Sequence, residues 1–211
     1  MTVIQSLASF VLAAGLLVVT PGLDTALILR TATSDGASQA MKAVLGIVVG
    51  CLVWGAATAV GLAALLAASE AAFTAVKWIG TAYLLWLGIG LIRRPRRSFE
   101  GLPGSGLGMG DHRLGWFWKG VLQNVLNPKM GIFYISFLPQ FVPAGRPPAG
   151  YTFLLAAIHG MLGLMWFAAL ILATRPLVHA LRRPVVLATL DRLTGCVFIA
   201  FGVNLALSRR P

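Results

Sequence analysis

The sequence Thr20-Pro21-Gly22-Leu23-Asp24 interrupts an apolar segment that is otherwise long enough to cross a lipid bilayer. Proline removes a backbone donor and clashes with the preceding helical turn, and glycine loosens the backbone. The backbone groups released there need partners that lipid cannot supply. A second break beside a charge occurs in a later apolar segment, at Asn127-Pro128-Lys129. Paired interruptions in corresponding halves of a chain indicate the binding site of a membrane transporter.

The composition of this 211-residue chain indicates a membrane protein. Hydrophobic residues make up 58% of it and charged residues only 11%, whereas soluble domains carry about 25% charged residues. The formal net charge is +11, but the basic residues gather between the apolar segments, as in Arg93, Arg94, Arg96 and Arg97. Basic loops beside membrane spans are expected from topology rules, so we exclude nucleic acid as a partner and expect a lipid bilayer.

The fold class that we predict is an all-α integral membrane protein with six transmembrane helices, at roughly 20 apolar residues for each span. The predicted spans are 3–32, 41–68, 71–92, 117–141, 150–174 and 187–208. The first is interrupted at Pro21-Gly22 and the fourth at Pro128. We expect the first segment to be a permanent span, because it lacks the basic start and short apolar core of a signal peptide. Lys77 and Asp191 lie near the starts of the third and sixth spans, within reach of the membrane interface.

Cationic residues are distributed unevenly between the two sides of such a bundle. The loops after the first, third and fifth spans hold twelve of them and the opposite side holds four. Cytoplasmic loops of membrane proteins carry the excess of Lys and Arg. We therefore predict a multi-pass protein of the bacterial inner membrane with both termini on the non-cytoplasmic side.

A glycine-rich stretch separates the third and fourth predicted spans. We interpret residues 99–115 as a flexible cytoplasmic linker, because a phosphate-binding loop would need a strand before it and a helix with Lys and Ser/Thr after it. The linker divides the chain into two three-helix repeats, residues 1–98 and residues 116–211.

The third and sixth predicted spans also share a weak sequence pattern. In each, a glycine is followed by aromatic residues three and six positions later, in Gly80-x-x-Tyr83-x-x-Trp86 and Gly195-x-x-Phe198-x-x-Phe201. Two independent packing faces could produce this match, since glycine rows let helices approach closely in lipid. Together with the two breaks, the pattern favours a duplicated unit. Because each unit has an odd number of spans, the two repeats would be inverted relative to each other.

Five motifs occur in order along nearly the whole chain. They are Thr20-Pro21-Gly22-x-Asp24, Gly46 with Gly50, Gly80-x-x-Tyr83-Leu84-Leu85-Trp86-Leu87-Gly88, Asn124-x-x-Asn127-Pro128-Lys129 and Phe137-Leu138-Pro139-Gln140-Phe141. Together they resemble the lysine exporter family, also called LysE/RhtB. That family often has a second Pro after the glycine, where this chain has Leu23. The resemblance implies a secondary transporter of the inner membrane that exports basic amino acids, threonine, homoserine or its lactone, or leucine.

Asp24 and Lys129 are ionisable residues beside the two breaks, and Asp24 is expected near the centre of the bilayer. An ionised carboxylate there costs at least a few kcal/mol unless it finds a partner or a proton. A substrate ammonium, Lys129 or a proton could fill this role, and cycling among the three would couple transport to the proton gradient. The alternative is a permanent ion pair between Asp24 and Lys129 that only holds the broken helices together.

Neighbouring polar residues have two interpretations each. Asn124 and Asn127 lie on one helical face, where they could contact the substrate or satisfy backbone groups released at Pro128. Thr20 has the same ambiguity beside Pro21. The half-helices that begin after the two breaks could receive a substrate carboxylate.

Three further residues are secondary candidates. His159 lies in the middle of a span. It could act as a proton relay, or it could be a buried histidine bonded to a backbone carbonyl. Gln140 could form a gate or a plain helix cap. Arg30 is expected to be an interface anchor more than a ligand.

The sequence has no cluster of His, Cys, Asp and Glu with metal-ligand spacing and no hydrolase motif. We therefore predict no metal, no cofactor and no enzymatic activity, with an amino acid and protons as partners; a homo-oligomer is left open. Cys51 and Cys196 raise the alternative of a membrane thiol–disulfide carrier, but they fall in non-equivalent spans and we expect packing thiols. The second alternative is a non-transporting scaffold, which would gain nothing from charged, interrupted helices.

Overall fold

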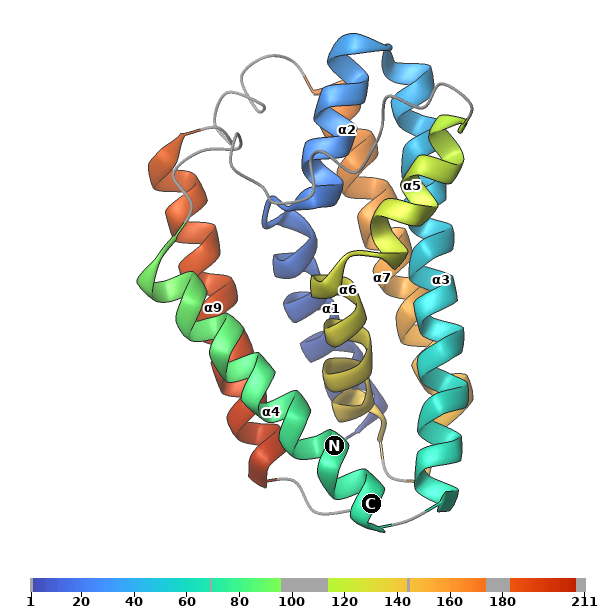
Figure 1. Ribbon diagram of the computed structural model, residues 1–211, viewed down its shortest axis with the longest axis vertical. Coiled ribbons are helices and arrows are strands. Elements are labelled where there is room, and N and C mark those ends of the chain that lie inside the picture. Colours follow the sequence, from blue (N-terminus) through green and yellow to red (C-terminus); the bar gives the residue numbers. More distant parts are fainter. Residues whose placement is uncertain (1, 69, 96–113, 144, 174–182, 208–211) are drawn as a thin grey trace.

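The computed structural model describes residues 2–68, 70–95, 114–143, 145–173 and 183–207, and the regular structure among them is entirely helical (Figure 1). The elements are α1 (Val3–Val19), α2 (Leu23–Ser34), α3 (Ala37–Ala68), α4 (Glu70–Arg93), α5 (Trp116–Val125), α6 (Pro128–Ile132), the π-helix η1 (Phe133–Phe137), the 3₁₀-helix η2 (Leu138–Phe141), α7 (Pro148–Leu172) and α9 (Pro184–Leu207). These bounds agree with the predicted helical segments to within a few residues. The predicted linker, 99–115, lies almost wholly outside the described residues.

The first predicted span consists of two helices. α1 begins with a capping box, in which the Thr2 hydroxyl accepts from the Gln5 N–H and the Gln5 side chain accepts from the Thr2 N–H. The axes of α1 and α2 differ by 51°. Pro21 and Gly22 lie in the gap, where proline cannot continue the hydrogen-bonding pattern of α1. The predicted interruption is confirmed.

The fourth predicted span is broken at Pro128, as expected, and is irregular beyond it. Asn127 caps α6, because its Oδ1 accepts from the backbone N–H of Lys129 over 3.1 Å. After α6 the helix widens into η1 and then tightens into η2. Pro139 stands in the first turn of η2, where a regular α-helix would clash with its ring. The sequence predicted the break but not this change of helix type.

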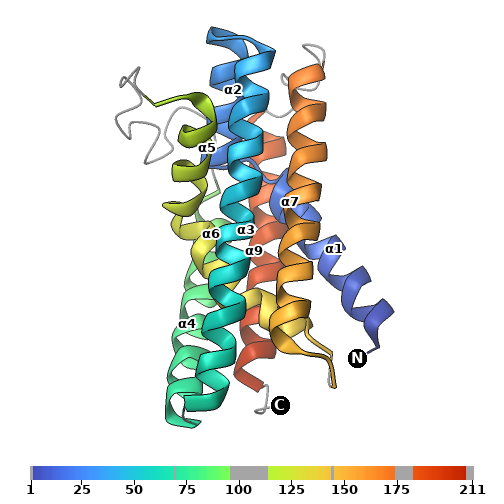
Figure 2. The same ribbon diagram turned by 90° about the vertical axis from the view of Figure 1, so that its right-hand side faces the viewer.

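The helices form an elongated bundle (Figures 1 and 2). In these views α1 and α2 together rise from the lower end, α3 descends, α4 rises, the segment from α5 to η2 descends, α7 rises and α9 descends. α3 packs along both α5 and α7, and α4 packs along α9. α1 therefore begins, and α9 ends, at the lower end of the bundle.

Glycine permits the closest helix contacts. A Cβ atom at Gly46 on α3 would collide with the carbonyl of Phe117 on α5. α4 and α9 meet reciprocally, since a Cβ atom at Gly88 would lie 2.7 Å from the Gly195 carbonyl oxygen, and one at Gly195 would lie 2.7 Å from the Gly88 oxygen. Any side chain at these positions would force the backbones apart.

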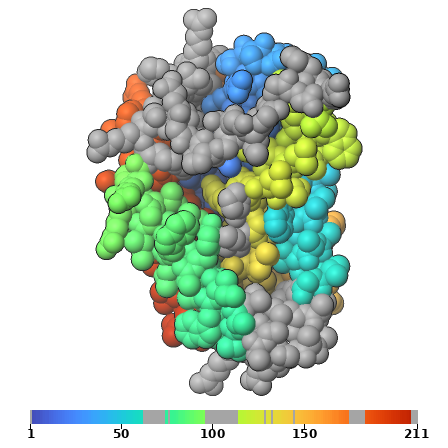
Figure 3. All heavy atoms as spheres, viewed as in Figure 1, coloured from blue at the N-terminus to red at the C-terminus, as the bar shows by residue number. Residues whose placement is uncertain are grey.

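The outside of the bundle is apolar. Leu12, Val60 and Trp86 are 76%, 70% and 68% exposed. Among the described residues, three helical stretches are long and apolar enough to cross a membrane, Ala37–Gly61, Pro148–Leu172 and Pro184–Leu207, and the bent pair α1 and α2 would make a fourth. Figure 3 shows the segment from α6 to η2 between α4 and α3. Exposed apolar surface on several helices is typical of contact with lipid.

Candidate functional site

The two helix breaks face each other in the middle of the bundle (Figure 1), and a cavity lies between them. Its volume is about 40 Å³, room for roughly three water molecules. Six of the predicted primary site residues and one secondary candidate line it: Thr20, Gly22, Asp24, Asn124, Asn127, Lys129 and His159. Pro21 and Pro128 instead form the breaks that bring these residues together.

Asp24 of α2 and Asn124 of α5 join the two breaks. Asn124 Nδ2 donates to Asp24 Oδ2 over 3.0 Å. Asp24 is 7% exposed and Asn124 is fully buried. The second oxygen of each side chain, Oδ1 in both, is buried and has no hydrogen-bond partner among the described residues. An unsatisfied buried acceptor costs about 1–3 kcal/mol, so this pair is ready to accept hydrogen bonds from a ligand.

Gly50 of α3 sets the position of the Asn124 amide. A Cβ atom at Gly50 would lie 2.7 Å from Asn124 Oδ1 and 2.8 Å from its Cβ. Only glycine leaves room for the amide between α3 and the cavity. This contact gives a physical reason for glycine at a position that the sequence analysis noted only as part of a motif.

Lys129 supplies positive charge to the cavity. Its Nζ lies beside the first break, 3.7 Å from where a Cβ atom of Gly22 would be. Its charge acts on both the Asp24 carboxyl group and the His159 ring. α2 begins next to it at Leu23, and the first turn of a helix presents backbone N–H groups with partial positive charge. The cavity is therefore lined by hydrogen-bond acceptors and by a cationic group.

A hydrogen-bonded group of side chains lies behind the cavity. The Tyr134 hydroxyl lies 2.8 Å from His159 Nδ1. Tyr134 is fully buried on η1, and Cys51 and His159 line the cavity. His159 Nδ1 is therefore bonded to a side chain. Tyr134 could not be identified from the sequence, because it lies outside the motifs and only folding brings it to His159.

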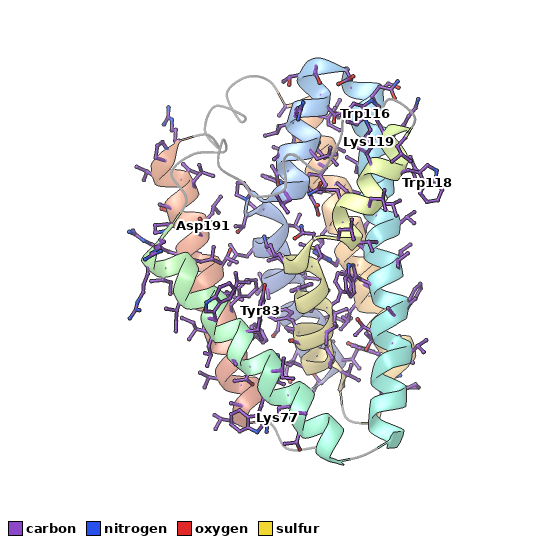
Figure 4. All side chains as sticks on the ribbon, viewed as in Figure 1. Lys77, Tyr83, Trp116, Trp118, Lys119 and Asp191 are labelled. Carbon is purple, nitrogen blue, oxygen red and sulfur yellow. The ribbon has the colours of Figure 1, made fainter. Side chains whose placement is uncertain are left out.

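Thr20 ties the first break to α9. Its hydroxyl donates to the Leu16 carbonyl over 2.7 Å and lies 2.5 Å from Thr194 Oγ1. Asp191, one turn before Thr194, is fully buried on α9 (Figure 4), whereas the sequence analysis placed it within reach of the interface. The reason is that this face of α9 turns toward the bundle and not toward the membrane surface.

Two secondary candidates lie outside the cavity lining. Gln140 Nε2 donates to the Ser136 carbonyl over 2.8 Å, and its Oε1 accepts from Asn204 over 3.2 Å. Gln140 therefore acts as a cap on η1, which was the plainer of its two interpretations. Arg30 is exposed at the upper part of α2, as an interface anchor would be. Cys196 is exposed on α9, so the expectation that it is a buried packing thiol is wrong.

Comparison with known proteins places this arrangement in a family. Residues 16–209 match the sequence profile of the LysE type translocators. The chain belongs to this family. The translocator is 32% identical to an uncharacterized membrane protein of Pseudomonas aeruginosa, over 94% of this chain and 93% of that protein. No solved structure matches it significantly.

Two relatives carry names that state a function. The translocator is 28% identical to the leucine efflux protein of Enterobacter sp., over 94% of this chain and 93% of the relative. It is 24% identical to the homoserine/homoserine lactone efflux protein of Salmonella typhimurium, over 95% of this chain and 96% of the relative. The predicted resemblance is confirmed, and family membership makes the protein a membrane transporter and not an enzyme.

Proposed function

We propose that this translocator exports amino acids or close derivatives across the bacterial inner membrane and that the proton gradient drives export. The observation that carries this proposal is the Asp24–Asn124 pair, which lines the cavity and has one buried, unpartnered oxygen on each side chain. An ammonium group offers three N–H donors and a positive charge, which match one neutral and one anionic acceptor. Lys129 and the start of α2 provide the complementary charge for the substrate carboxylate.

Proton coupling follows from competition for Asp24. The carboxylate can hold a substrate ammonium or a proton, and a protonated Asp24 has no charge with which to hold the ammonium. A proton entering from outside would therefore release the substrate outward and return with the carrier to the cytoplasmic side. Each exported substrate molecule would be exchanged for at least one proton that enters the cell. A permanent ion pair between Asp24 and Lys129 would instead make transport independent of a pH gradient.

The same proposal includes six membrane spans arranged as two inverted three-helix repeats, residues 1–98 and 116–211. Equivalent helices of the two halves pack in pairs, α3 with α7 and α4 with α9, and the halves run in opposite directions (Figure 2). The reciprocal contact of Gly88 and Gly195 is what a two-fold axis between α4 and α9 would produce. Residues 99–115 would link the repeats on the cytoplasmic side, with both termini outside.

Transport by purified protein in liposomes tests the function. Vesicles would be loaded with radiolabelled leucine, homoserine or lysine, and release would be measured with and without an imposed pH gradient. Faster release of at least one of them, when the outside is acidic and the protein faces outward as in the cell, is the expected result. Release that matches protein-free vesicles for every compound would contradict the proposal and favour the scaffold alternative.

The thiol–disulfide alternative has little support in the structure. Cys51 and Cys196 are both free, one buried at the cavity and the other exposed on α9. A redox couple would need two thiols that can approach each other. A double Cys51→Ser and Cys196→Ser variant is expected to retain transport in the same vesicles. Loss of transport on addition of a reductant, in the wild type alone, would instead support a redox role.

A further inference from the structure

One wall of the cavity is formed by α7. His159, Gly160, Gly163 and Phe167 line it from this helix, and Ile47 lines it from α3. Gly163 and Phe167 are buried, and a Cβ atom at Gly163 would find nothing nearer than 3.9 Å, the Phe167 ring. Gly163 leaves open space beside the Phe167 ring, so this part of the cavity is an apolar recess.

The α-ammonium and the α-carboxylate of an amino acid would pair with the two oppositely charged residues of the lining, Asp24 and Lys129. Asp24 is the only carboxylate among the described residues that line the cavity, and one of its oxygens has no hydrogen-bond partner among those residues. We assign this carboxylate to the α-ammonium. A basic side chain would need a second acceptor, and Lys129 would repel it. No carboxylate from α7 faces the recess among the lining residues.

Hydroxyl groups near the cavity are also already engaged. Thr20 Oγ1 is bonded to the Leu16 carbonyl and Thr194, and Thr25 Oγ1 accepts from the Gly22 N–H over 3.3 Å. His159 Nδ1 is bonded to Tyr134. A polar substrate side chain placed against α7 would lose its bonds to water and meet an apolar wall, which costs free energy.

We infer that this translocator carries amino acids with uncharged, apolar side chains, and that Gly160, Gly163 and Phe167 of α7 form the recess that receives the side chain. The inference rests on the proposed export function and assigns its substrate class. Gly163 limits the size of that side chain, because any larger residue there would fill the space beside Phe167. One methylene in an apolar pocket typically changes discrimination about 10-fold or more.

Counterflow in liposomes with the full-length protein tests both parts. Vesicles would be loaded with unlabelled leucine, alanine, homoserine or lysine and placed in a solution of the same compound carrying a label. The rate at which the label enters the vesicles measures exchange. Leucine is expected to exchange at least tenfold faster than lysine or homoserine. Faster exchange of lysine or homoserine would overturn the inference while leaving the export function standing. Absence of exchange for all four compounds would overturn both.

Gly163→Ala then tests the recess itself. There is room for the added methyl group, so the variant is expected to fold with an unchanged melting temperature. The ratio of leucine to alanine exchange should fall about tenfold. Gly90→Ala is the matched control, because Gly90 lies exposed on α4 with nothing within 4 Å of its Cβ position; its ratio should stay at the wild-type value. An unchanged ratio in Gly163→Ala would overturn the assignment of this recess.

Discussion

Replacement of Asp24 by Asn separates the charge of this carboxylate from its place in the fold. The amide has the same shape, and its carbonyl oxygen can still accept the hydrogen bond that Asn124 Nδ2 now donates over 3.0 Å. The other end of the amide then places an NH₂ group at the position of the unpartnered Asp24 Oδ1. Two donors would meet at that point when a substrate ammonium arrives. The break geometry should survive while the binding chemistry is lost.

The size of the effect follows from the interaction that disappears. A hydrogen bond between charged groups contributes about 1.5–3 kcal/mol, and each 1.4 kcal/mol is a factor of ten in affinity. We therefore expect Asp24→Asn to bind substrate roughly 10- to 150-fold more weakly. Because the amide cannot take up a proton, the response of export to a pH gradient should vanish altogether.

Two measurements on purified protein check this prediction. Substrate-induced thermal stabilisation reports affinity, and release from loaded liposomes at equal and unequal pH reports coupling. Asp35→Asn is the matched control, because Asp35 is an exposed carboxylate at the end of the same helix, α2. Its affinity and coupling should equal those of the wild type. Export by Asp24→Asn that still accelerates with the pH gradient would refute the reasoning and leave Asp24 a structural role.

Three further variants follow from the same geometry. Lys129→Met removes the positive charge that Lys129 brings to the cavity and should slow export from liposomes at least tenfold. Lys129→Arg keeps the charge and should retain part of the rate. Tyr134→Phe leaves His159 Nδ1 without its 2.8 Å partner, which should lower stability by about 1–3 kcal/mol, measured by thermal unfolding in detergent. Gly46→Leu should drive α3 away from the Phe117 carbonyl and lower the yield of monodisperse protein in size-exclusion chromatography, while Gly15→Leu should not.

The positions of the helices and of both breaks could be predicted from the sequence. Pro21 and Pro128 cannot continue a helix wherever the chain folds, because proline lacks the N–H and clashes with the preceding turn. The apolar segments are equally insensitive to context, since their composition suits lipid alone. The ionisable residues beside the breaks, Asp24 and Lys129, could also be identified as site candidates, because charged groups inside a membrane are costly and are usually functional.

Several features of the site could not be predicted because they depend on contacts between distant residues. Tyr134 reaches His159 only because η1 packs beside α7. Asp191 is buried because of the rotation of α9 about its own axis, which local sequence does not define. The π-helical turn before Pro139 is a response of a packed helix to proline.

The sequence by itself determined where the helices run, where they break and which charges lie beside the breaks, because these properties depend on local covalent geometry and on hydropathy. Only the tertiary structure decided that the breaks meet, that Asn124 bonds to Asp24 and that both residues line one cavity. Helix packing alone sets those distances, through close contacts such as the one at Gly50.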